Sequence, residues 1–439
     1  MNIELITLVV IISFLGLLMA GVPMAFTMGG SAIVLTLILW GPDFIPLILM
    51  RIFEQMASYT FVAAPMFIFM ASVLERIGVA EELFEGIYSW IGSIRGGLAI
   101  TVVIACTILA AMVGIIGAGI VLMGLIALPQ MLKRGYDKNL ATGTIMASGC
   151  LGILIPPSIL FVVYSMVAGV SVGKLFAGAI IPGLMLSFAY VLYITIRCYL
   201  NPKIGPAANE KNLEPISIKK KLMLLKNLIA PMLLIVTVMG SIFFGIATPT
   251  EAAGVGSFCA LLIAVARGKL SFLMLKETAM QTVKVSAMIM WIIFGATALI
   301  SVYTRAGGAR FMEEVIHALP LGPWELFIAV QMLFFIMGFF LDWIGILMLT
   351  GPLLIPIMAE IGFDPLWFGI VFALNMQMAF LTPPFGPAMF YMKGVVPAEI
   401  KITDLYRAVI PFICLQLLVL IIVILYPSLA LWLPAKLFP

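Results

Sequence analysis

The chain has 439 residues, of which 64% are hydrophobic and 10% are charged, and its formal net charge is +4. Soluble domains average about 45–50% apolar and about 25% charged residues, so this composition excludes cytosolic enzymes, nucleic-acid-binding proteins and disordered proteins. A helix needs roughly 20 residues to cross a hydrocarbon core of about 30 Å. The length therefore predicts an all-α polytopic membrane protein.

Apolar stretches mark the expected membrane spans in chain order. Eight of them are long enough, or nearly long enough, to cross a bilayer: 5–20, 22–40, 58–75, 174–199, 227–247, 250–266, 280–303 and 404–426. Two further regions are cut by Gly and Pro into half-length pieces. Such pieces predict re-entrant hairpins at about 97–133 and 322–360, and broken helices at about 137–169 and 365–394.

Gly, Asp and Pro residues that typically end or start helices recur at a fixed separation along the chain. Gly-Tyr-Asp at 135–137 matches Gly-Phe-Asp at 362–364, and the Pro-Pro pair at 156–157 matches the pair at 383–384, both 227 positions apart. Self-similarity at one offset indicates a tandem duplication. We expect a first repeat at 1–199, a polar linker at 200–221 and a second repeat at 222–439.

The distribution of charge predicts how the two repeats are oriented. From Arg197 to Lys226 there are seven basic residues against two acids, which assigns the linker to the cytoplasm. Three basic residues lie between 133 and 138, whereas the equivalent loop in the second half carries Glu360, Asp364 and no base. Matching segments are therefore expected on opposite faces of the membrane, as in an inverted repeat.

The two Pro-Pro pairs carry the predicted chemistry. A proline lacks an N–H and clashes with the carbonyl four residues back, so each pair frees two carbonyl oxygens from helical hydrogen bonds. An unsatisfied buried carbonyl costs a few kcal/mol, and Na⁺ could replace the lost bonds. Alternatively, Ser, Thr or water satisfies the freed groups, as in many kinked membrane helices. The prolines are Pro156, Pro157, Pro383 and Pro384, and the freed carbonyls belong to Gly152, Ile153, Ala379 and Phe380.

Polar side chains beside these breaks are candidates for a ligand site. A half-helix that starts after a break directs its positive N-terminal dipole toward mid-membrane, where a carboxylate would be favoured. Ser148 and Asn375, which are 227 positions apart, and Thr382 could add side-chain ligands or bond back to their own helices. An intramembrane acid such as Asp342 is a functional candidate by default, and its alternative role is a hydrogen-bond acceptor at a hairpin tip. The candidate substrate-site residues are Ser148, Ser158, Asp342 and Asn375.

Several separated motifs resemble one transporter family. They are the two Pro-Pro segments, Leu-Pro-Gln-Met-Leu-Lys-Arg-Gly-Tyr at 128–136, Ala-Thr-Pro-Thr-Glu-Ala-Ala at 247–253 and Phe-Leu-Asp at 340–342. In this order they resemble the large membrane subunit of tripartite ATP-independent periplasmic (TRAP) transporters, of the dicarboxylate-transporter M type. The resemblance covers essentially the whole chain.

This resemblance implies a fold and a mechanism. It implies an elevator-type secondary transporter of the ion-transporter superfamily, in the bacterial inner membrane, that imports small organic acids with Na⁺. The implied partners are a four-helix small membrane subunit and a soluble periplasmic substrate-binding protein. Selection of the acid would lie largely with that binding protein, so the substrate cannot be read from this chain.

The resemblance also implies two sodium sites made mostly of backbone carbonyls. The first is expected to use Ala110, Ile115, Gly152, Ile155 and Pro157, and the second Gly338, Ala379, Thr382 and Phe385. One departure affects substrate contacts. Many relatives carry a Ser-Gly-Ser type of hairpin tip, whereas this chain has Val-Gly-Ile-Ile at 113–116 and no hydroxyl.

Two other functions are alternatives to the importer. A stand-alone Na⁺- or H⁺-coupled carboxylate carrier would work without a binding protein. An intramembrane enzyme lacks its chemical groups here, because His317, expected in an interfacial loop, is the single histidine and no GxxxxGK[ST] phosphate-binding motif occurs. The sequence therefore predicts a transporter rather than an enzyme.

Overall fold

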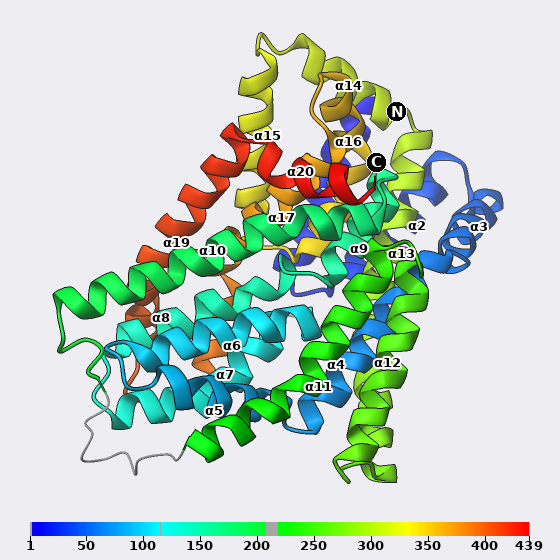
Figure 1. Cartoon of the computed structure of the whole chain (residues 1–439). Coiled ribbons are helices and arrows are strands. Elements are labelled where there is room, and N and C mark those ends of the chain that lie inside the picture. The colour runs from blue at the N-terminus through cyan, green and yellow to red at the C-terminus, as the bar shows by residue number, and fades with distance from the viewer. Residues whose placement is uncertain (1, 115, 208–217, 439) are drawn as a thin grey trace.

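The computed structural model describes residues 2–114, 116–207 and 218–438, and all regular secondary structure in these ranges is helical (Figure 1). The prediction of an all-α protein is confirmed. Seven helical stretches are long and apolar enough to cross a membrane: 59–76, 172–200, 221–243, 249–266, 272–305, 343–360 and 402–425. The expected spans at 5–20 and 22–40 are apolar helices of 17 and 16 residues. The helix at 343–360, expected as one arm of a hairpin, has the length of a span.

The first half of the chain contains ten α-helices and three short 3₁₀ turns within the described residues. Before the first hairpin region these are α1 (Ile3–Met19), α2 (Met24–Leu39), η1 (Pro42–Phe44), α3 (Ile45–Met56), η2 (Tyr59–Val62), α4 (Ala63–Arg76) and α5 (Val79–Ile91). The remainder are α6 (Gly97–Val113), α7 (Ile116–Lys133), α8 (Lys138–Gly149), η3 (Cys150–Ile153), α9 (Ile159–Ala168) and α10 (Val172–Leu200).

The second half contains ten α-helices within the described residues. They are α11 (Ile218–Phe243), α12 (Pro249–Ala266), α13 (Phe272–Arg305), α14 (Gly308–Ala318), α15 (Pro323–Met337), α16 (Trp343–Glu360), α17 (Pro365–Leu381), α18 (Pro387–Lys393), α19 (Ile402–Leu425) and α20 (Ser428–Leu437). Helices α7 and α16 begin and end 227 residues apart, and α8 and α17 begin 227 residues apart. Helix boundaries thus follow the same offset as the sequence motifs.

The turns that start α8 and α17 use the same local device. Gly135 and Gly362 have φ values of +78° and +100°, a left-handed conformation that glycine adopts without steric cost. Two residues later, Asp137 accepts hydrogen bonds from the first backbone N–H groups of α8, at 3.0 Å each. Asp364 does the same for α17, at 2.7 and 3.2 Å. These N-caps satisfy donors that a helix start leaves unpaired.

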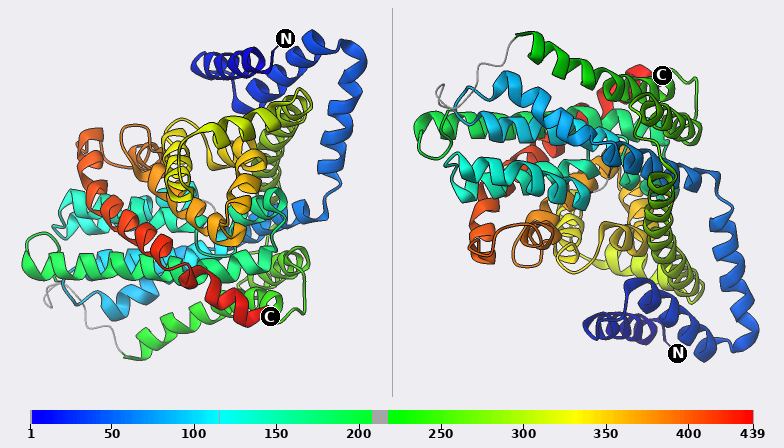
Figure 2. Two further views of the ribbon diagram at one scale, coloured as in Figure 1. Left: turned by 90° about the horizontal axis from the view of Figure 1, so that it is seen from above. Right: turned by 90° about the horizontal axis from the view of Figure 1, so that it is seen from below.

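Two groups of helices pack into one core (Figure 1). Helices α4, α12 and α13 lie side by side, and α2 packs along α13. The other group contains α6, α7, α8 and η3 together with α10, α17 and α19. Because α19 of the second half packs on α8 of the first, and α17 contacts η3, the two halves interlock. Helices α1 to α3 extend along one edge of the molecule (Figure 2).

Several details differ from the sequence expectations. Helices α3, α5 and α14 are short amphipathic helices that the search for apolar stretches did not assign. The expectation that His317 lies in a loop was wrong, because it occupies the last turn of α14. The linker expected at 200–221 ends earlier, since α11 begins at Ile218; its residues 208–217 lie outside the described part of the chain.

Candidate functional site

Both Pro-Pro pairs interrupt a helix. In the first half, α8 ends at Gly149, a 3₁₀ turn follows, and α9 begins at Ile159. In the second half, α17 ends at Leu381 and α18 begins at Pro387. Both Pro-Pro peptide bonds are cis. Residues 150–160 are all buried, whereas Pro384 and Phe385 are exposed.

Of the four carbonyls that the prolines were expected to free, two accept a hydrogen bond in the structure. The Ile153 oxygen accepts a hydrogen bond from the Ser158 hydroxyl at 2.7 Å, and the Ala379 oxygen accepts one from the Thr382 N–H at 3.1 Å. For Gly152 and Phe380, the residues four positions later are prolines without an N–H. Within the described ranges, no side chain, turn or cap donates to either oxygen. Among the described residues, one of the four carbonyls therefore remains without a donor in each half.

The first hairpin tip lies against the first break. Gly114 ends α6 with φ of +61°, and a Cβ placed on it would come within 2.8 Å of the Pro157 carbonyl oxygen. Ala110 of this hairpin and Gly152 of the break line one cavity. The structure thus brings Ala110, Gly152 and Pro157 to the same region. Ile155, two residues before Pro157, is buried. Ile115 lies outside the described residues.

The second hairpin meets the second break in a different way. Gly338 lies directly against the side chain of Ala379, and the rings of Phe340 and Phe385 are 5.3 Å apart between centroids. The Thr382 hydroxyl donates to the Met378 carbonyl at 2.7 Å. A hydroxyl that donates one hydrogen bond keeps its lone pairs, so this bond leaves the Thr382 oxygen able to accept or to coordinate a cation.

The candidate substrate-site side chains make mostly local hydrogen bonds. Ser148 donates to the Thr144 carbonyl within α8, and Ser158 bridges its own break as described. Asp342 caps α16 and accepts from the Ile344 N–H at 3.4 Å. Asn375 differs, because its amide reaches across to α15 and donates to the carbonyl oxygen and to Oε1 of Gln331, at 2.7 and 2.8 Å.

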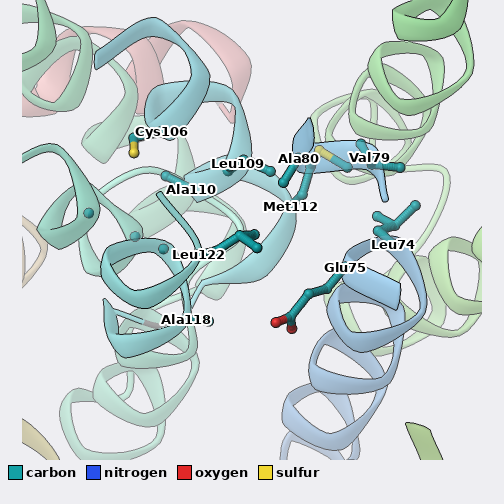
Figure 3. A pocket seen from close by; sticks show the side chains of 13 residues that line it. Leu74, Glu75, Val79, Ala80, Cys106, Leu109, Ala110, Met112, Ala118 and Leu122 are labelled. Carbon is teal, nitrogen blue, oxygen red and sulfur yellow. The ribbon is translucent and has the colours of Figure 1, made fainter. Parts of the chain in front are cut away.

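A cavity separates α4 and α5 from the first hairpin and its break (Figure 3). It offers about 20 Å³ to the centres of water-sized molecules. Glu75 provides the charged side chain of its lining, and sequence reasoning missed this residue. The sequence signal was an acid at the end of an apolar stretch, next to Arg76. Gly149 of α8 and Gly152 of η3 also line the cavity. The remaining lining residues come from α4 to α7 and are Leu74, Val79, Ala80, Cys106, Leu109, Ala110, Met112, Ala118, Gly119 and Leu122.

An exposed cluster on another surface has the side chains of a divalent-metal site. Ligand atoms of Glu313, His317 and Glu360 lie within 4.8 Å of one another. Glu313 and His317 come from α14, and Glu360 ends α16. All three side chains are exposed, and they lie on other helices than the two Pro-Pro breaks.

Comparison with known proteins identifies the family. The family model for the tripartite ATP-independent periplasmic transporter, DctM component, matches residues 11–429. The C4-dicarboxylate TRAP transporter large permease protein DctM of Vibrio cholerae is 34% identical, over 96% of each chain. The sialic acid TRAP transporter large permease protein SiaM of the same species is 29% identical, over 97% of each chain.

A solved structure supports the fold. The YdaH transporter of Alcanivorax borkumensis superposes with a TM-score of 0.67 at 13% identity, over 96% of this chain and 99% of that one. With the seven candidate spans, the matches make this chain a multi-pass protein of the bacterial inner membrane. It belongs to the DctM family, the large permease component of the tripartite ATP-independent periplasmic transporters.

Proposed function

We propose that this chain is the translocating subunit of a sodium-coupled, binding-protein-dependent importer of small organic acids. One observation carries the proposal: in each half, a hairpin lies against a break in a helix, and one buried carbonyl of that break has no donor among the described residues. Two such units, built at the same sequence offset, provide two places for a coupling ion. In this proposal the two halves are inverted repeats and move the ion and solute by an elevator mechanism.

Sodium fits the chemistry of these breaks. A buried carbonyl without a partner costs a few kcal/mol, and Na⁺ is coordinated well by unwound backbone carbonyls at such interruptions. Gly152 and Phe380 would supply the unpaired oxygens, and Thr382 would add a hydroxyl oxygen in the second half. The ion would stabilise the hairpin against the break when bound.

The first break also favours an anion. Helix α9 has ten residues and begins directly after the first break, so its N-terminal dipole faces the region where the ion would bind. A carboxylate would be stabilised there by the dipole and by a neighbouring Na⁺. The named substrates of the two relatives, C4-dicarboxylates and sialic acid, carry carboxylates, which supports organic acids as the substrate class.

Membership of this family supports the proposal that the chain works with two partner proteins. The tripartite system implies a small four-helix membrane subunit and a periplasmic protein that delivers the acid. The basic 197–226 segment supports a cytoplasmic position for the linker, which would place α15 and α16 as a hairpin entering from the periplasm. The chain would have no enzymatic activity of its own.

Transport in proteoliposomes tests the proposal. The chain is reconstituted with its small membrane subunit, and acid uptake is measured with an inward Na⁺ gradient and loaded binding protein. We expect uptake only when both are present. Uptake that persists unchanged in sodium-free, proton-buffered medium would reject sodium coupling, and equal uptake of free acid without the binding protein would show a stand-alone carrier instead.

A further inference from the structure

Glu75 is an exposed residue whose carboxylate reaches the lining of this cavity. It is the penultimate residue of α4, and its carboxylate points across the cavity toward the Ala118 and Leu122 side of α7 (Figure 3). Its neighbour Arg76 is engaged elsewhere, in an ion pair with Glu277 of α13. Within the described part of the chain, the Glu75 carboxylate forms no ion pair and accepts no hydrogen bond.

The size of the cavity limits what it can hold. About 10–15 Å³, measured in this way, is enough for one water molecule, and this cavity offers about 20 Å³. It therefore accepts one guest of the size of water or Na⁺, and it is too small for an organic acid.

The lining of the cavity selects for positive charge. Apart from Glu75 and the thiol of Cys106, the side chains that line it are apolar or absent. Gly152, whose carbonyl oxygen has no hydrogen-bond donor among the described residues, also lines the cavity. A negative carboxylate and a free carbonyl oxygen around a small space attract a cation and repel an anion.

The cavity also lies between two groups of helices. On one side, α4 packs against α12 and α13; on the other, α6, α7 and η3 form the first hairpin and break. A cation in the cavity would be held by groups from both sides. If the two groups of helices move relative to each other during transport, Glu75 would face the first sodium site only when the helices are arranged as they are in this structure.

We propose that Glu75 binds a monovalent cation of Na⁺ size at the mouth of this cavity and passes it to or from the first hairpin and break. The proposal rests on the sodium coupling proposed above and adds a side-chain ligand to a site otherwise made of backbone oxygens. Removing the charge should therefore weaken Na⁺ binding while the organic acid still binds.

Sodium-dependent thermal stability of the full-length chain in detergent provides the test. Unfolding is followed as Na⁺ replaces choline at constant ionic strength, which gives the half-saturating Na⁺ concentration. For Glu75→Gln we expect this concentration to rise about tenfold, the factor that corresponds to about 1.4 kcal/mol. Glu75→Asp keeps the charge and should lie between Glu75→Gln and the wild type.

Two further variants separate the effect of the site from general effects. Glu85→Gln removes the same charge from the exposed face of α5, away from the cavity lining, and should behave as the wild type. In Gly119→Ala the added methyl enters the lining at 3.6 Å from the Gly149 Cα, an ordinary packing distance. This variant should fold normally and still require more Na⁺, because the methyl narrows the cavity.

The outcomes distinguish the two proposals. If Na⁺ stabilises the wild type and Glu75→Gln responds at the same concentration, the role of Glu75 is wrong while sodium coupling stands. If Glu85→Gln loses Na⁺ response as strongly as Glu75→Gln, the effect is one of surface charge and the assignment to the cavity fails. If Na⁺ and choline act identically on the wild type, sodium coupling is wrong and the role of Glu75 falls with it.

Discussion

The two hairpin-and-break units have the same order of helices but different contacts. In the first, α7 approaches α8 almost backbone to backbone at Gly149, and the whole break is buried. In the second, the contacts are made by side chains, with Gly338 against Ala379 and Phe340 against Phe385, and the break is partly exposed. The same order of helices therefore gives one closed unit and one unit with a hydroxyl and an exposed edge.

The largest effect is expected where the first unit packs most closely. A Cβ added to Gly149 would lie 3.0 Å from the Ile120 backbone nitrogen and 3.2 Å from its Cα. Backbone atoms of a buried helix cannot move aside cheaply, and overpacking of this kind costs about 1–3 kcal/mol. We expect Gly149→Ala to lower the midpoint of thermal unfolding in detergent and to abolish Na⁺-dependent stabilisation.

Gly119→Ala is the matched control for stability. It adds the same methyl to the facing helix, where the nearest atoms are 3.6 and 3.7 Å away, so its unfolding midpoint without Na⁺ should stay close to that of the wild type. An unchanged midpoint for Gly149→Ala as well would mean that α7 and α8 can separate freely, and the first unit would not be the tightly packed one.

The next largest effect is expected from the hydroxyl of the second unit. Thr382→Val removes an oxygen beside the second break while keeping the side-chain shape, and we expect the half-saturating Na⁺ concentration for uptake to rise about fivefold, equivalent to about 1 kcal/mol. Ser158→Ala removes a hydroxyl from the first break that pairs with the Ile153 carbonyl. It should lower stability by about 1 kcal/mol and change Na⁺ dependence less than Thr382→Val.

The pair of variants sharpens the comparison because the two hydroxyls occupy corresponding breaks. Uptake assays in proteoliposomes give the Na⁺ dependence, and unfolding in detergent gives the stability. Equal and negligible shifts in Na⁺ dependence would remove Thr382 from the second sodium site. A larger shift for Ser158→Ala would reverse the proposed division of roles between the two units.

The sequence was sufficient where local chemistry determines the backbone. Proline cannot continue a helix without losing a hydrogen bond, so the interruptions after Gly149 and Leu381 follow from the Pro-Pro pairs. Glycine at positive φ followed by a capping Asp likewise determines where α8 and α17 begin. These features depend on a few neighbouring residues and recur at the same offset.

The sequence was insufficient where position in space decides the role. Glu75 ends an apolar stretch beside Arg76, a pattern typical of a solvated helix end, and only tertiary packing places its carboxylate opposite the first hairpin. Amphipathic helices α3, α5 and α14 carry too many charges to stand out by hydropathy. Which freed carbonyls remain unpaired also depended on Ser158 and on the turn at Thr382, which the proline rule alone does not specify.

The smallest difference between the two units is expected at the helix caps, where they are most alike. Asp137 and Asp364 each accept two backbone hydrogen bonds, and loss of an N-cap costs about 0.5–2 kcal/mol. Asp137→Ala and Asp364→Ala should therefore lower the unfolding midpoint in detergent by similar, modest amounts. The corresponding Asn variants keep a capping oxygen and should recover most of the loss.

Similar costs at the two caps would locate the difference between the units at their hairpin contacts rather than at their helix starts. The Asp137 backbone N–H also donates to the Ile204 carbonyl of the connection after α10, at 2.9 Å. That bond survives substitution by alanine, so a large asymmetry would have to come from the side chain, and the repeated cap would then have acquired a separate role in the first half.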